Sequence, residues 1–206
     1  VEYEVKKNIG EEVELLTYEN GDILAKTREA GYVTKEAASL LMDLYSNAVK
    51  DGSEAVLNIC SSVGETADAM QSFAKYVGVP IVRIDEEMCR EAVRLGKRIG
   101  VLATLSTTLE PTKNTIKRVA REMDKKIELI DGLIEGAFGI DQETFVKRMI
   151  EKTGEINDQV DVILLCQGSM AYAERHIEKE FKKPVLSSPR FGAASLKEAL
   201  RQKGVL

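Results

Sequence analysis

The sequence has few of the residues that build metal sites, disulfide frameworks or membrane spans. Its 206 residues include one histidine, His176, three cysteines and no tryptophan. The cysteines are far apart and form no CxxC pair, so neither a zinc site nor a disulfide framework is expected. The longest apolar runs are strand-sized, well short of the ~20 residues that a membrane span needs. No signal-peptide pattern opens the chain.

What is present is the balance of an ordinary soluble globular protein, with 44% hydrophobic and 31% charged residues. The net charge of −5 provides no attraction for nucleic acid or for an anionic membrane, so we expect neither as a partner. Reduced thiols favour a cytoplasmic location. A chain of this length can form one large domain or two small ones.

Strand and helix patterns alternate along the whole chain. This order predicts an α/β fold with parallel strands and helices on both faces of the sheet. Thr34 and Asp85 are expected to cap helices, Gly96 to follow a helix end, and Pro111 to lie near a first turn. The predicted strands are 12–19, 54–60, 80–84, 98–104, 126–131, 161–166 and 184–188. The predicted helices include the opening residues, 34–52, 65–78, 86–95, 111–124, 141 onward, 169–181 and 193–203.

Two segments of the chain repeat one order of features. EAVLNICSSVGETADAM…VGVPIVRI and DVILLCQGSMAYAER…FKKPVLSS each have an apolar strand ending in cysteine, then a helix, then a proline that opens a short strand. Cys60 precedes Pro80 by 20 residues and Cys166 precedes Pro184 by 18. This indicates duplication. The second half has four predicted strands and the first only three, so the counterpart of 98–104 is expected upstream of Val1.

The repeat places two thiols at the carboxyl ends of parallel strands, where ligands bind in open α/β sheets. Each cysteine precedes a helix N-terminus, which is expected to lower a thiol pKa. Two thiols facing one cleft suit a two-base proton transfer, in which one base removes a proton from a stereocentre and an acid returns one on the other face. Hydroxyls at the same edge are candidates to stabilise the enediolate: Ser61, Ser62, Thr104, Ser106, Thr107 and Ser169.

Four pieces of the chain carry a family resemblance: NICSS (58–62), GKRIGVLATLSTT (96–108), LLCQGSMA (164–171) and KKPVLSSP (182–189). With them the chain resembles the aspartate/glutamate/hydantoin racemase superfamily. The resemblance implies two pseudo-symmetric αβα domains, each with a mostly parallel sheet of about four strands, and an active site in the cleft between them. It implies domains of 1–96 plus 190–206 and of 97–189. It also implies catalysis without a cofactor, with Cys60 and Cys166 as the acid/base pair.

The resemblance extends to binding residues and to the substrate class. Ser61 and Ser62 match the small polar pair that holds the substrate carboxylate, and Thr104, Ser106 and Thr107 match a substrate-contacting loop. Gln167, Gly168 and Ser169 resemble the hydantoin racemase branch. We therefore expect a small carboxylate or a cyclic amide as substrate, in a protein that forms homo-oligomers as many soluble enzymes do. Three alternatives stay open: a decarboxylase, a cis–trans isomerase with the same thiol chemistry, and a non-catalytic small-molecule binding protein.

The remaining polar candidates have simpler interpretations. Cys89 lies in mid-helix and is expected to pack in the core, and His176 is expected on the surface or at a cap. Glu65 and Glu174 follow the two cysteines but fit ordinary helix positions. Ser187 and Ser188 end the last strand and are expected to face either the cleft or a hinge. The glycine-rich segment 132–139 matches no phosphate-binding motif and is predicted to be a loop.

Overall fold

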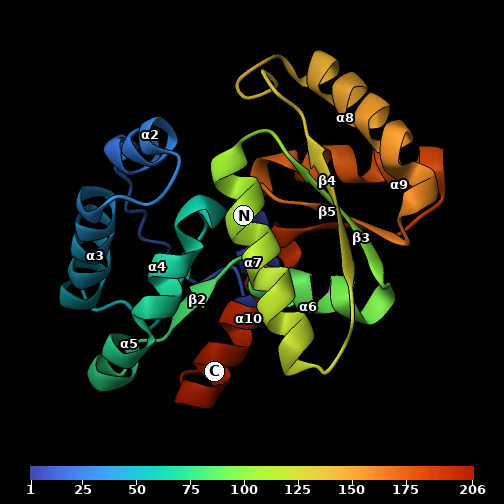
Figure 1. The fold of residues 1–206 in the computed structure, drawn as a ribbon. Helices are drawn as coiled ribbons and strands as arrows, with labels where there is room; N and C mark the ends of the chain where they lie inside the picture. Colours follow the sequence, from blue (N-terminus) through green and yellow to red (C-terminus); the bar gives the residue numbers. More distant parts are fainter. The chain divides into compact units, whose positions relative to one another are not determined.

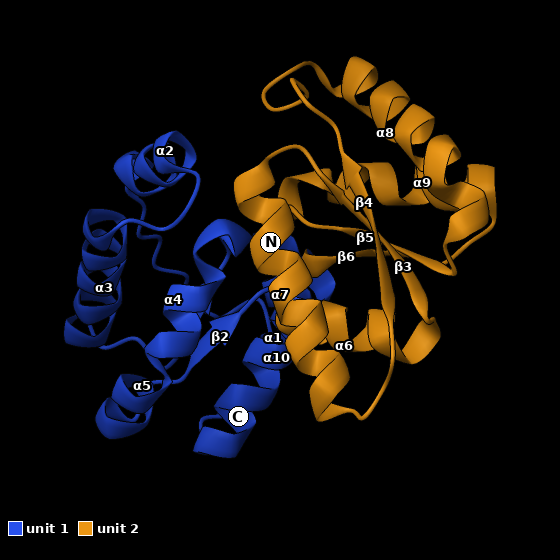
Figure 2. Cartoon of the chain, viewed as in Figure 1, with its two compact units in different colours: residues 1–84, 189–206 blue, residues 85–188 orange.

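The computed structural model describes residues 1–206 as an α/β protein in which all paired strands are parallel. This confirms the predicted fold class. Two compact units divide the chain at Ile84 and Asp85: residues 1–84 with 189–206, and residues 85–188 (Figure 2). The boundary predicted from the sequence lies after residue 96. The intervening helix α6 (Glu86–Leu95) packs against the helix and strand elements of the second unit.

The first unit is built on a two-stranded sheet, in which β1 (Val56–Asn58) pairs with β2 (Ile81–Arg83). One face packs on a cluster with α3 (Lys35–Lys50) and α4 (Gly64–Ala69), and the other on α1 (Glu2–Ile9) and α10 (Ser188–Lys203) (Figure 1). Thr34 caps α3 as predicted, since its hydroxyl accepts a hydrogen bond from the Ala37 N–H. The unit also contains α2 (Gly21–Ala30) and α5 (Gln71–Val77).

Two predictions for the first unit need correction. The predicted strand 12–19 is wrong, because this segment has no regular structure and pairs with neither strand. Leu15 and Leu16 are exposed there, so the alternation of apolar and acidic residues has no sheet face to cover. The predicted helix 65–78 is interrupted at Met70, whose ψ of 5° ends α4 before α5 begins.

The second unit contains the four predicted strands in one sheet of order β4-β3-β5-β6. They are β3 (Arg98–Ala103), β4 (Glu128–Leu133), β5 (Val162–Leu165) and β6 (Val185–Ser187). The helices α8 (Gln142–Ile156) and α9 (Glu174–Phe181) cover the core on one face. On the other side of the sheet, α6 contacts β5 and α7 (Ser106–Glu122) contacts β3 (Figure 1). β5 is fully buried, as a central strand of a parallel sheet should be.

Several helix boundaries in the second unit differ from the prediction. α7 starts directly after β3, so Pro111 lies inside the helix rather than near its first turn. Asp85 is at the N-cap position of α6 but its side chain makes no capping hydrogen bond. Gly96 ends α6 with extended backbone rather than a left-handed residue. Its role is spatial, because a Cβ there would lie 2.7 Å from the Cβ of Asp161.

The remaining differences are smaller. The predicted helix 169–181 begins as a 3₁₀ helix, η3 (Gly168–Ala173), before α9, and the last helix starts at Ser188 instead of 193. The predicted loop 132–139 begins only after β4, which continues to Leu133. None of the helices is both long and apolar enough to cross a membrane.

Candidate active site

Cys60 lies just beyond the end of β1, at the N-cap position of a short 3₁₀ helix, η1 (Ser61–Val63), with no capping hydrogen bond from its side chain. Its thiol is not in a disulfide and is half-buried. Ser61 and Ser62 are both buried, and the Ser61 hydroxyl has no hydrogen-bond partner within the protein. Because a buried hydroxyl without a partner is costly, a water molecule or a ligand is needed here to supply the missing bond.

Two residues that the sequence analysis passed over fix the backbone at Cys60. The Tyr45 hydroxyl donates to Asn58 Oδ1 at 3.1 Å, and Asn58 Nδ2 donates to the Cys60 carbonyl at 3.1 Å. Burial raises the pKa of Tyr45, and the neighbouring Cys60 charge raises it further, so the phenol stays a neutral donor. Asn58 lies in the apolar run VLNIC. A polar amide in such a run predicts a buried hydrogen bond, and this was the sequence feature that could have identified Asn58.

Cys166 directly follows β5 and is fully buried. Burial raises the pKa of its thiol far above the usual range, and the charges of Asp85 and Asp131 act in the same direction. The expected lowering by a helix N-terminus is therefore wrong for Cys166, because the loss of solvation outweighs it. The thiol form is therefore favoured at neutral pH.

Thr104 and Gln167, both predicted to bind substrate, bind each other across the ends of β3 and β5. Gln167 Nε2 donates to Thr104 Oγ1 at 2.6 Å, and the Thr104 N–H donates to Gln167 Oε1 at 3.0 Å. The pair ties the residue after Cys166 to the neighbouring strand. The Thr104 hydroxyl accepts in this pair, so its proton is available for donation to a ligand.

The first turn of α7 supplies the other candidate groups of the second unit. Thr107 is buried, and its hydroxyl has no partner within the protein, whereas Ser106 is exposed. α7 has 17 residues, and the amino end of such a helix carries partial positive charge and N–H groups without intrahelical partners. This end of the helix is therefore suited to an anion such as a carboxylate. Gly168 is half-buried and Ser169 exposed, both in η3.

The strand pairing shifts the two cysteines by one residue relative to each other. The Val56 N–H donates to the Pro80 carbonyl at 2.8 Å, and the Ile163 N–H donates to the Pro184 carbonyl at 3.0 Å. Cys60 lies four residues after Val56, but Cys166 lies three residues after Ile163. Side chains alternate between the two faces of a strand, so this shift of one residue puts the two thiols on different faces. One thiol lies on the face covered by the helix that follows it, and the other lies on the opposite face.

The buried contacts agree with this shift. In the first unit, Val56 and Cys60 pack on the cluster that includes Ala67 of the following helix α4. In the second unit, Ile163 and Leu165 pack on the cluster that includes the following helix α9, and Cys166 interacts instead with Thr112 of α7. The two thiols therefore end similar strands in different surroundings.

The other polar candidates behave mostly as expected. Cys89 is fully buried in α6, and His176 is exposed on α9 with Nδ1 3.2 Å from the Tyr172 carbonyl oxygen. Glu65 is exposed, but Glu174 accepts a hydrogen bond from the Ser187 hydroxyl at the end of β6. No group of three histidine, cysteine or acidic side chains is arranged to hold a metal ion.

Comparison with known proteins adds a family and a fold. The family model described as Asp/Glu/Hydantoin racemase matches residues 2–196. Glutamate racemase RacE1 from Bacillus anthracis superposes with a TM-score of 0.70 and 16% identity, over 100% of this chain and 78% of that one. Allantoin racemase from Pseudomonas fluorescens superposes with a TM-score of 0.57 and 19% identity, over 84% and 72%. Unliganded arylmalonate decarboxylase superposes with a TM-score of 0.52 and 19% identity, over 95% and 80%. No curated protein sequence matches significantly.

Proposed function

Because the chain belongs to the Asp/Glu/hydantoin racemase family, we propose that it is a cofactor-independent racemase or epimerase with Cys60 and Cys166 as its two acid/base groups. The observation that carries this proposal is that a thiol follows a parallel strand in both units, Cys60 after β1 and Cys166 after β5. Buried hydroxyls without a protein partner occur at Ser61, directly after Cys60, and at Thr107 and Ser188, which follow β3 and β6 of the second sheet. The proposal requires both thiols to reach one substrate carbon.

The proposed reaction moves one proton off the α-carbon and one proton on. In one direction the Cys60 thiolate takes the α-proton, and the bonding electrons pass into the neighbouring carbonyl group to form an enediolate. The Cys166 thiol then gives its proton to the opposite face of the carbon, which leaves Cys60 as thiol and Cys166 as thiolate. Hydroxyls of Ser61 and Thr107 and the amino end of α7 supply donors for the oxygen atoms that gain charge.

The protonation of the two thiols supports this assignment. Two-base transfer needs one thiolate and one thiol at the start, and burial keeps Cys166 in the thiol form. The reverse reaction starts with Cys60 as a thiol and Cys166 as a thiolate, so the site must stabilise the Cys166 thiolate transiently. Both thiols must remain reduced, which favours the cytoplasm as the place of action.

We propose a small carboxylate or a cyclic amide as the substrate class. Similar folds occur in a glutamate racemase and in an allantoin racemase, whose named substrates represent these two chemistries. The sequence after Cys166, Gln167-Gly168-Ser169, resembles the hydantoin branch, but Gln167 is held by Thr104. We therefore assign Gln167 to positioning the strand end and leave Ser61, Ser62, Thr104, Ser106, Thr107, Gly168 and Ser169 as candidate ligand contacts.

Burial of Cys166 favours a second candidate, a decarboxylase that uses a single thiol. In that reaction the substrate loses CO₂ instead of a proton, and only one acid is needed to protonate the resulting carbanion. Arylmalonate decarboxylase shares the fold, and Cys60 is the more accessible of the two strand-end thiols. Cys60 would then be the protonating acid.

Solvent exchange separates these functions. Single enantiomers of glutamate, aspartate and allantoin are incubated with the protein in D₂O, and deuterium at the α-carbon is followed by NMR. We expect exchange with one of them, and a loss of about a hundredfold or more in Cys60→Ala and in Cys166→Ala. Cys89→Ala is the control, since Cys89 is a buried thiol within α6 that has no role in the proposed reaction. Full activity in Cys166→Ala would replace the two-base mechanism by the single-thiol one. Binding without exchange would overturn the racemase proposal and leave the decarboxylase and a non-catalytic binding protein.

A further inference from the structure

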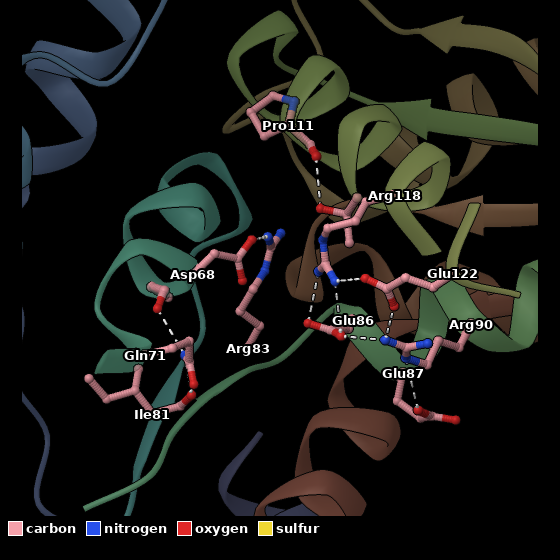
Figure 3. A network of polar contacts seen from close by, with 12 residues as sticks. Asp68, Gln71, Ile81, Arg83, Glu86, Glu87, Arg90, Pro111, Arg118 and Glu122 are labelled. Atoms are coloured by element: carbon pink, nitrogen blue, oxygen red, sulfur yellow. Dashed lines mark hydrogen bonds and ion pairs between the residues drawn. The ribbon is translucent and has the colours of Figure 1, made fainter. Parts of the chain in front are cut away.

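A buried cation lies behind the turn that carries Cys60. Arg83 ends β2 directly opposite Asn58 in the strand register and is 4% exposed. Its Nη1 donates to Asp68 Oδ2 on α4 at 2.6 Å, and Figure 3 shows the two side chains pointing toward each other. Arginine is almost never fully buried unless it is paired, and Asp68 is the partner that the burial of Arg83 requires.

Gly64 makes room for this guanidinium. A Cβ at Gly64 would lie 2.4 Å from Nη2 and 2.5 Å from Cζ of Arg83, so no larger residue fits without displacing the arginine. The φ of Gly64 is −59°, so the glycine is not needed for its conformation. The guanidinium therefore lies against the backbone at the first residue of α4.

The backbone segment that leads to Gly64 begins at Cys60. The Val63 N–H donates to the Cys60 carbonyl at 3.2 Å, so residues 60–63 form one closed turn that ends next to Gly64. Asn58 donates to the Cys60 carbonyl from β1, while the Arg83 guanidinium, from the neighbouring strand, lies against Gly64 at the far end of the turn. A thiol that acts as a base thus shares one turn of backbone with a buried positive charge.

We propose that Arg83 is a positioning residue that holds Cys60 ready as a thiolate, and that Asp68 limits the strength of its charge. This inference rests on the proposed function, in which Cys60 is the base. A cation near a thiol favours the thiolate, and water exclusion strengthens the interaction. The Asp68 side chain is 36% exposed, so it offsets the arginine charge only in part.

The other charged or titratable groups around this turn do not replace Arg83. Tyr45 on α3 faces the turn, but its raised pKa keeps it neutral. Glu65 on α4 and Lys75 on α5 are exposed, where water weakens their effect on a half-buried thiol. Arg83 lies against the turn and carries the positive charge, and Asp68 is its negatively charged partner.

The test measures thiol reactivity and needs no substrate. The full chain is treated with iodoacetamide across a range of pH, and alkylation of the peptide that contains Cys60 is followed by mass spectrometry. In Arg83→Gln we expect the midpoint of the rate profile to move up in pH and alkylation at pH 7 to slow about five- to tenfold. In Asp68→Asn the midpoint should move down, because the arginine charge is no longer offset. Arg83→Lys should restore most of the wild-type profile.

Lys26→Gln is the matched control, because it removes one positive charge from an exposed ion pair with Glu36 in the same unit. Shifts in opposite directions for Arg83→Gln and Asp68→Asn, both larger than in Lys26→Gln, would support the proposal, since a purely structural role does not reverse sign with charge. Shifts in one direction, or none beyond the control, would overturn it. Loss of racemase activity alone bears on the proposed function and not on this result.

Discussion

The two strand ends that carry Cys60 and Cys166 share a sequence pattern but differ in surroundings. Cys60 is half-buried, its carbonyl accepts a hydrogen bond from the Asn58 amide, and Arg83 lies against Gly64 at the end of its turn. Cys166 is fully buried, and its thiol is kept protonated by burial. The same order of strand, thiol and helix therefore produces one half-buried thiol and one fully buried thiol that burial keeps protonated. The two-base reaction that we propose would start from such a difference.

A shift of one residue in strand pairing accounts for much of this difference. Cys60 is four residues beyond the strand's first bond to its partner, and Cys166 is three beyond the equivalent bond. Since the side-chain period of a strand is two, the shift turns one thiol toward the following helix and the other away from it. The sequence repeat predicts where the thiols occur along the chain, while strand register decides what surrounds each one.

The largest expected contrast is in thiol reactivity. In the native protein at pH 7, iodoacetamide should modify Cys60 at least about a hundredfold faster than Cys166, because only the thiolate reacts and burial both blocks access and raises the Cys166 pKa. Mass spectrometry of the modified peptides measures both rates in one sample. In guanidinium chloride the two rates should become similar, which controls for intrinsic reactivity. Equal alkylation rates of Cys60 and Cys166 in the native protein would show that the two thiols do not differ in reactivity.

The sequence predicted the features that depend on local pattern. Apolar runs located β1, β2 and the four strands of the second unit, and the repeat located both cysteines at strand ends. The segment 12–19 failed because alternation predicts a strand only where a neighbouring strand can pair with it.

The remaining site residues depend on contacts between segments far apart in the chain. Asn58 and Arg83 face each other through strand register, and the need for Gly64 exists only because Arg83 occupies the adjacent space. Gln167 was predicted to bind substrate because of its place after Cys166. Its pairing with Thr104, 63 residues earlier, became visible only in the folded sheet.

Asn58 and Gln167, which hold the two strand ends by hydrogen bonds, should contribute differently to the free energy of unfolding. Asn58→Leu leaves the buried Tyr45 hydroxyl without its acceptor, so we expect the free energy of unfolding to fall by about 1–3 kcal/mol. Gln167→Leu affects a half-buried pair with Thr104 and should cost about 1 kcal/mol. Urea unfolding of the full chain measures both.

A second substitution checks the cause of the Asn58 effect. In Tyr45→Phe/Asn58→Leu both partners become apolar, so part of the lost stability should return. A double variant as unstable as the sum of the single ones would show that the unpaired hydroxyl is not the reason. Thr27→Val, which removes a buried hydrogen bond to the Ile23 carbonyl in the same unit, is the control for a general loss of buried polar contacts.

The smallest expected contrast concerns the acidic residue before each cysteine-bearing strand. Asp161 precedes β5 and accepts hydrogen bonds from the Arg98 side chain at 2.6 Å and from the N–H groups of Lys97 and Arg98. The Arg98 side chain, with these N–H groups, lowers the Asp161 pKa from 3.8 to about 2. A lowered pKa in the folded state stabilises the protein above pH 4, and this stability is lost as the pH falls toward 2.

Asp161→Asn should therefore weaken the protein near neutral pH, with the difference from wild type shrinking between pH 4 and pH 2. Glu54 occupies the comparable place before β1, where its carboxylate pairs with Lys203 at 2.5 Å and makes no such set of backbone contacts. Glu54→Gln should change the acid profile less, because exposed ion pairs contribute little. Thermal unfolding followed at several pH values measures both variants. If Glu54→Gln changed the pH dependence of stability more than Asp161→Asn, the hydrogen bonds from the Lys97 and Arg98 N–H groups to Asp161 would not be the cause of the acid sensitivity.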